Sequence, residues 1–176
     1  MIGEDSCCGA TRAMLAYARA MMRGEDTPRL GKDGLGAADR LFVTNRRADD
    51  GLDVMGDGLD LLFAAPDRTA DFGRLFSPPE RRLILALLDA VAMAGEPGVI
   101  RAHGLSRDSA RVEVELMLSP LPAFWSRGDR FLGHAVAITP SAPAIATRLT
   151  INTMLTPASS TPLRPRPALR LVVSNS

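Results

Sequence analysis

Residues 111–140 read RVEVELMLSPLPAFWSRGDRFLGHAVAITP, and this stretch decides the fold. Its first half alternates apolar and polar residues: Val112, Val114, Leu116 and Leu118 against Arg111, Glu113, Glu115 and Ser119. A period of two residues is typical of a strand with one buried and one solvated face. After a break at residues 119–129, which contains prolines and a glycine, residues 131–139 read as a second strand. The stretch predicts a long antiparallel hairpin with a core face and a wet face.

The composition is that of an ordinary soluble globular protein. The chain has 176 residues, of which 46% are hydrophobic and 23% are charged, and its formal net charge is +1. This length suits one domain with extensions. Residues 142–176 hold four arginines and no acidic residue. Their wide spacing is too sparse to indicate a nucleic-acid or membrane surface partner, and we predict neither.

The two cysteines, Cys7 and Cys8, are adjacent and near the N-terminus. An adjacent pair cannot link distant elements, so we expect no disulfide framework. The pair also lacks the spacing of a metal site, and we interpret it as part of a mobile N-terminus outside the core. Cysteine usage and the lack of a long apolar run favour a cytoplasmic protein without a membrane segment.

Residues 25–39 are interpreted as a connector, and an amphipathic helix is predicted before it, over residues 11–23. The apolar stripe of this helix contains Met14, Tyr17, Met21 and Met22. Methionine-rich stripes suit adaptable contacts, so we expect these four residues to form a dimer or partner surface. The alternative is that the stripe packs against its own domain.

The clearest helix signal lies at residues 77–95. Ser77, Pro78 and Glu80 have the spacing of a capping box with proline at the first helical position, and Gly95 marks the end. Four apolar residues share one face of this helix and should enter the core, namely Ile84, Leu87, Leu88 and Val91.

Further strands are predicted at residues 40–45, 52–55 and 99–103, and residues 145–155 read as one more strand or as a β-capable tail. We divide the chain into an N-terminal helix and connector (1–36), a folded domain (37–141) and a basic, proline-rich tail (142–176).

The segments FGRLFSP (72–78) and EPGVIRAHG (96–104), together with the hairpin, resemble stand-alone bacterial PAS proteins in their order. The resemblance implies an α+β fold: a five-stranded antiparallel sheet with helices on one face, here with an added N-terminal amphipathic helix and an extended C-terminal tail. It also implies sensing or scaffolding, through self-association and through histidine kinases or cyclic-dinucleotide enzymes, in processes such as cell-cycle or motility control.

Known cofactor-binding subclasses of PAS proteins do not fit these residues. A photoactive flavin protein needs a cysteine beside the flavin, and the cysteines here lie only at positions 7 and 8. A haem protein needs an axial ligand, and the two histidines, His103 and His134, fall in predicted strands outside the usual haem-binding helix. We therefore predict no cofactor and no metal.

Two function hypotheses follow. The first is a non-catalytic homodimer that docks on a signalling protein, with Glu113, Glu115 and Trp125 on an exposed sheet face. The two glutamates and His103 could also be drawn as an acid/base site, but alternating charge is typical of a solvated strand face and we predict no enzyme. The second is a receptor for an apolar ligand, in a pocket lined by Phe63, Phe72, Phe76, Ile84 and Leu88. In its alternative, these five side chains fill the space themselves.

Overall fold

The computed structural model describes residues 4–26, 40–47, 49, 51–60, 62–64, 71–122, 129–138 and 141–157. In chain order its helices and strands are η1 (Glu4–Ser6), α1 (Gly9–Met22), β1 (Leu41–Arg46), β2 (Leu52–Met55), η4 (Phe72–Leu75), α2 (Pro78–Ala94), β3 (Gly98–Leu105), β4 (Arg111–Pro120), β5 (Arg130–Ala137) and β6 (Thr150–Leu155).

The strands form one antiparallel sheet in the order β2-β1-β5-β4-β3-β6. The predicted hairpin is confirmed, because β4 pairs with β5 in a register that places Leu116 opposite Ala135. The strands predicted at residues 40–45, 52–55 and 99–103 are β1, β2 and β3. Of the two alternatives for residues 145–155, the structure has the strand: β6 pairs with β3 and makes the sheet six-stranded.

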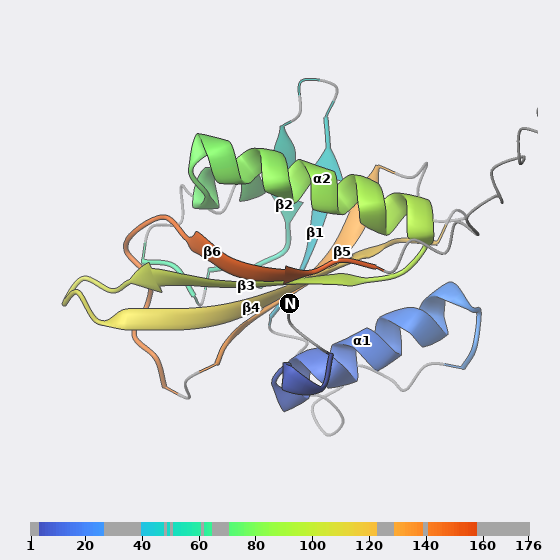
Figure 1. The fold of residues 1–176 in the computed structure, drawn as a ribbon, viewed down its shortest axis with the longest axis horizontal. Coiled ribbons are helices and arrows are strands. Elements are labelled where there is room, and N and C mark those ends of the chain that lie inside the picture. Colours follow the sequence, from blue (N-terminus) through green and yellow to red (C-terminus); the bar gives the residue numbers. More distant parts are fainter. Residues whose placement is uncertain are drawn as a thin grey trace, which may run out of the picture.

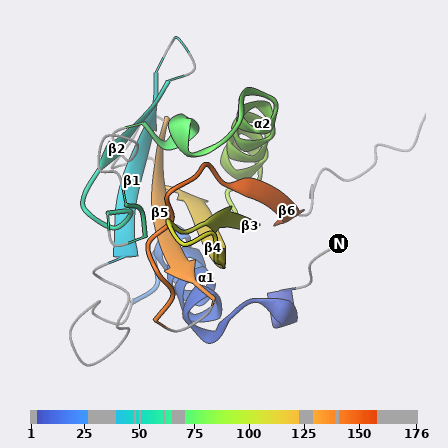
Figure 2. The ribbon, with the colours of Figure 1, turned by 90° about the vertical axis from the view of Figure 1, so that its left-hand side faces the viewer.

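Helices cover both faces of this sheet. α2 lies on one face and α1 on the opposite face, as Figure 1 shows with α2 above the sheet and α1 below it. Figure 2, turned by 90°, shows the same arrangement of the two helices. The PAS-like α+β fold is confirmed, and the N-terminal helix adds a third layer. The division of the chain at residues 36 and 141 stays a prediction.

The helix α2 begins and ends where its sequence signals lie. The Ser77 hydroxyl donates to the Glu80 carboxylate at 2.5 Å, the capping box is complete, and Gly95 ends the helix at a positive φ of 65°. The other carboxylate oxygen of Glu80 accepts the backbone N–H of Ile151 at 2.8 Å. One carboxylate therefore both caps α2 and ties β6 to it.

The main core lies between α2, η4 and the sheet. Ile84, Leu87, Leu88 and Val91 are buried in it, as predicted. Val112, Val114, Leu116 and Leu118 of β4 face them from the sheet. This is the core face of the hairpin that the alternation predicts.

The opposite face of the hairpin is not wet. Met117 of β4 and Val99 of β3 are fully buried there, in a second apolar cluster with Met14, Leu15 and Ala18 of α1. The prediction of a solvated face is wrong over this part of the sheet, because α1 folds back onto it. The domain therefore has two cores, one on each side of the sheet.

Candidate functional site

The five residues of the predicted ligand pocket do come together. All of them belong to the main core, and none is more than 4% exposed. The Phe72 ring lies with its centroid 5.4 Å from that of Phe42 and 5.5 Å from that of Phe76. These are contact distances for aromatic pairs, so the rings pack on one another. Both interpretations of these five residues, a ligand pocket and a core that the side chains fill themselves, stay predictions.

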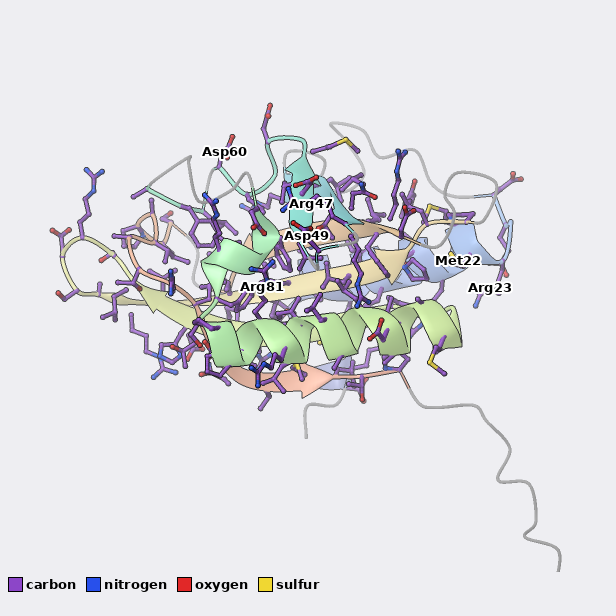
Figure 3. All side chains as sticks on the ribbon, turned by 90° about the horizontal axis from the view of Figure 1, so that it is seen from above. Met22, Arg23, Arg47, Asp49, Asp60 and Arg81 are labelled. Atoms are coloured by element: carbon purple, nitrogen blue, oxygen red, sulfur yellow. The ribbon has the colours of Figure 1, made fainter. Side chains whose placement is uncertain are left out.

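The predicted partner stripe of α1 divides into two parts. Met14 and Met21 are buried, and Met14 lies in the second cluster against the protein's own sheet. These two residues therefore pack within their own domain, which is the alternative to a partner surface. Tyr17 and Met22 are half-buried, and Figure 3 shows Met22 at the end of α1, near Arg23.

The predicted exposed face of β4 needs a correction. Glu115 is fully buried, because α1 covers it. Glu113, two residues earlier on the same face, is half-buried and pairs with Arg111 at 3.1 Å. Trp125 lies outside the described residues.

A polar cluster surrounds the buried Glu115 at the beginning of α1. Arg101 of β3, which lies directly opposite Glu115 in the sheet, donates to its carboxylate at 2.5 Å and to the carbonyl oxygen of Ser6 at 2.7 Å. The backbone N–H of Cys8 donates to the other carboxylate oxygen at 2.9 Å. These contacts join the sheet to the residues that precede α1.

Electrostatics stabilise this arrangement. Burial alone would raise the pKa of Glu115, but hydrogen bonds from Arg101, Cys8 and Thr11 outweigh it and hold the pKa below its ordinary value of 4.5. Glu115 is therefore ionised at neutral pH. The first turn of α1 contains no acidic residue of its own, so this carboxylate supplies the negative charge that a helix N-terminus favours.

The three residues that could form an acid/base site in the sequence each make a structural contact instead. His103 lies opposite Glu113 in the sheet, but its Nδ1 is 2.7 Å from the Asn152 side-chain oxygen. Glu113 is paired with Arg111, and Glu115 with Arg101. Each of the three groups therefore has a partner of its own.

The prediction of a mobile N-terminus outside the core is wrong at Cys7, which is only 4% exposed and belongs to the second cluster. Both cysteines are free thiols. Over the part of the chain that the structure describes, no three His, Cys, Asp or Glu side chains are placed to hold a metal ion. Within the same residues, no helix has the length and apolar character needed to span a membrane.

Sequence reasoning missed Arg101 and His134 as residues of the sheet face beneath α1. Both stand on the face that α1 covers, Arg101 as the partner of Glu115 and His134 as a fully buried side chain. A signal was present: the same face carries Val99, Met117 and Leu132, which is more apolar surface than a solvated face needs.

A model of the family described as "PAS domain" matches residues 10–136. No curated protein matches the chain. The match extends from α1 to β5, so it includes both the covering helix and the hairpin.

Solved structures of light-oxygen-voltage (LOV) proteins are similar to the chain. The LOV protein of Rhodobacter sphaeroides has a TM-score of 0.42 at 13% identity, and a structure described as the RsLOV d2 variant has a TM-score of 0.42 at 15% identity. Each alignment covers 60% of this chain and 62% of the other. An RNA-binding light-oxygen-voltage receptor has a TM-score of 0.41 at 16% identity, covering 78% of this chain and 47% of the receptor. The chain thus spans less than two thirds of these proteins.

Proposed function

Because the chain belongs to the PAS domain family, we propose that it is a non-catalytic, cytoplasmic signalling and scaffold protein that dimerises and docks on a signal-transduction partner. Family membership suggests a signalling or sensory role. The partner class, a histidine kinase or a cyclic-dinucleotide enzyme in bacterial cell-cycle or motility control, is carried over from the PAS resemblance of the sequence.

The observation that carries this proposal is the packed interior between α2 and the sheet. Phe63, Phe72, Phe76, Ile84 and Leu88 are all buried in contact with one cluster. A ligand would have to displace aromatic side chains that already pack against one another. A signal is therefore better transmitted through a surface than through a pocket.

The second candidate is a sensor of an apolar ligand. It is favoured by the fact that the five predicted pocket residues share one location, between helices and sheet, where PAS proteins hold ligands. The two candidates differ in one property, the presence of a small molecule in the folded protein, which native mass spectrometry measures.

For the dimer, the accessible parts of α1 and of the sheet beside it are the proposed surface. Tyr17 and Met22 remain half-exposed on α1, and Glu113 lies half-exposed on β4. The accessible aromatic and apolar side chains of α1 suit a reversible contact between protein copies.

Light scattering tests this dimer. The wild-type protein should have twice the mass of the 18.8 kDa chain, and Met22→Glu should shift it toward a single chain, since a carboxylate would be desolvated in the contact. Met93→Glu is the matched control, because Met93 is 88% exposed on α2, on the opposite side of the sheet, and should leave the mass unchanged. A wild-type mass of one chain at every concentration, or equal behaviour of the two variants, would refute the proposed surface.

A further inference from the structure

His134 of β5 is a fully buried histidine. Its side chain is 0% exposed, and neither ring nitrogen has a hydrogen-bond partner among the described residues. Buried polar groups in proteins are generally hydrogen-bonded, because an unpaired one loses its bonds to water without compensation. An interior histidine of this kind can be accommodated only in its neutral form.

The ring lies between the sheet and α1. Leu41 of β1 and Met117 of β4 are the residues directly opposite His134 in the two neighbouring strands, so their side chains share its face. Met117 is fully buried and packs in the second cluster with Met14, Leu15 and Ala18 of α1, and Leu41 packs against that cluster. Among the residues that the structure describes, α1 is therefore the layer over His134 on this side of the sheet.

The charged surroundings favour the neutral ring. Burial and then the positive charge of Arg40, just before β1, lower the pKa of His134 to about 4, and the carboxylate of Glu115 on β4 opposes them. That carboxylate is already engaged by Arg101 of β3 and by Cys8 at the beginning of α1. From α1 itself, Tyr17 is the titratable side chain packed against the cluster.

Among the described elements that pack around the ring, α1 is the one that can yield if the ring becomes charged. On the sheet side, β5 is hydrogen-bonded between β1 and β4, so moving the strand would break two ladders. α1 is held by fewer bonds: the contacts of Glu115 and Arg101 at its beginning, and an ion pair of Arg19 with Glu96 at 3.0 Å further along. Between these anchors its contact with the sheet is apolar.

We propose that α1 is an acid-released cover of the sheet, and that protonation of His134 is the trigger. The imidazolium ion needs hydrogen bonds that the interior does not provide, and release of α1 admits the water that supplies them. The released sheet face carries Val99, Met117 and Leu132. In the proposed signalling function, acidification would be the signal that the protein senses. The inference rests on the proposed function for this point alone.

The sign of the effect follows from proton binding. With α1 docked, His134 takes up a proton only near pH 4, whereas an exposed histidine does so near its ordinary value of 6.5. The released state therefore binds more protons between these limits, and docking weakens as the pH falls from 6.5 towards 4. At pH 5 the docking constant should be about 20-fold lower than at pH 7. Glu115 acts in another window, since its ion pair is lost only below pH 4.5.

Hydrogen–deuterium exchange of the full chain tests the proposal. We expect the amides of α1 to lose about 20-fold in protection between pH 7 and pH 5, after correction for the intrinsic exchange rate, while the amides of α2 and β4 keep theirs. His134→Phe and His134→Leu, which cannot be protonated, should remove this loss. His103→Asn is the matched control, because it replaces the other histidine of the chain and should respond to acid as the wild type does.

Three results would overturn the proposal. The first is equal protection of α1 at pH 7 and pH 5 in the wild type, and the second is an acid response that survives in the His134 variants. The third is parallel loss in α1, α2 and β4, which indicates global unfolding. If the His134 variants do not fold, titration of the His134 ring in the wild type by NMR replaces them. A ring that titrates at pH 6.5 while the amides of α1 stay protected contradicts the proposal. None of these outcomes depends on the dimer mass.

Discussion

Replacing Leu88 by Ala is expected to lower the free energy of unfolding by about 2 to 5 kcal/mol. Leu88 is 0% exposed, on the face of α2 that packs in the main core. The loss combines the transfer of buried methyl groups to water with the cavity that remains after the substitution. Helix propensity does not add to it, because Ala is at least as favourable as Leu in a helix. Chemical denaturation monitored by circular dichroism measures the change.

Leu83→Ala is the matched control for this experiment. It is the same substitution in the same helix, but Leu83 is 45% exposed. Its effect should be within about 0.5 kcal/mol, as for surface positions in general. Equal losses in the two variants would mean that α2 does not face the sheet in the orientation described.

Glu115→Gln is expected to cost about 3 kcal/mol, the lower end of the range for removing one partner of a buried ion pair, because 26% of the Arg101 side chain stays exposed. The change leaves the Arg101 guanidinium without its counter-charge and weakens the acceptor for the N–H of Cys8. The loss should be greatest for the docking of α1, which this carboxylate connects to the sheet. Denaturation together with amide exchange of α1 measures both effects.

Glu113→Gln is the control for Glu115→Gln, since Glu113 lies on the same strand and face but pairs with Arg111 near solvent. Its effect should be below about 1 kcal/mol, as for exposed ion pairs.

The dependence of stability on acid pH provides a second check of the Glu115 ion pair. Because the pKa of Glu115 is lowered on folding, its contribution is present above pH 4.5 and is lost as the pH falls through its folded pKa. The loss of stability below pH 4.5 should therefore be smaller in Glu115→Gln than in the wild type; similar curves would contradict the ion pair.

The elements with strong local signals could be predicted from the sequence. The alternation of β4, the capping box of Ser77 and Glu80, and the stop at Gly95 are each fixed by interactions within a few residues. The same is true of β1 and β2, whose bounds differ from the prediction by one residue or less. Local chemistry decides these elements, and the fold class follows from their order.

The position of α1 could not be predicted in the same way. Its apolar stripe indicates that it packs against something, but the same stripe suits a partner, a second copy or the protein's own sheet. The deciding contacts are between residues far apart in the chain: Cys8 reaches Glu115, and Arg19 reaches Glu96. Whether Glu115 is a solvated surface charge or a buried one therefore depends on where α1 folds.

The residues of the candidate site likewise divide into those that the sequence predicts and those that it does not. The five predicted pocket residues do share one core, because their apolar character requires burial. Arg101 and His134 were missed because charged residues are mostly exposed and a histidine can be either buried or exposed. The burial of His134 and of the carboxylate that Arg101 contacts depends on the second core, which the sequence pattern does not reveal until α1 is placed.

Native mass spectrometry of the protein purified from its own host tests the claim that the interior is filled by its own side chains and that the signal leaves through a surface. We expect the mass of the bare chain, 18.8 kDa, or a whole multiple of it. An added small-molecule mass that is retained under native conditions and lost on denaturation would contradict this claim and favour the sensor.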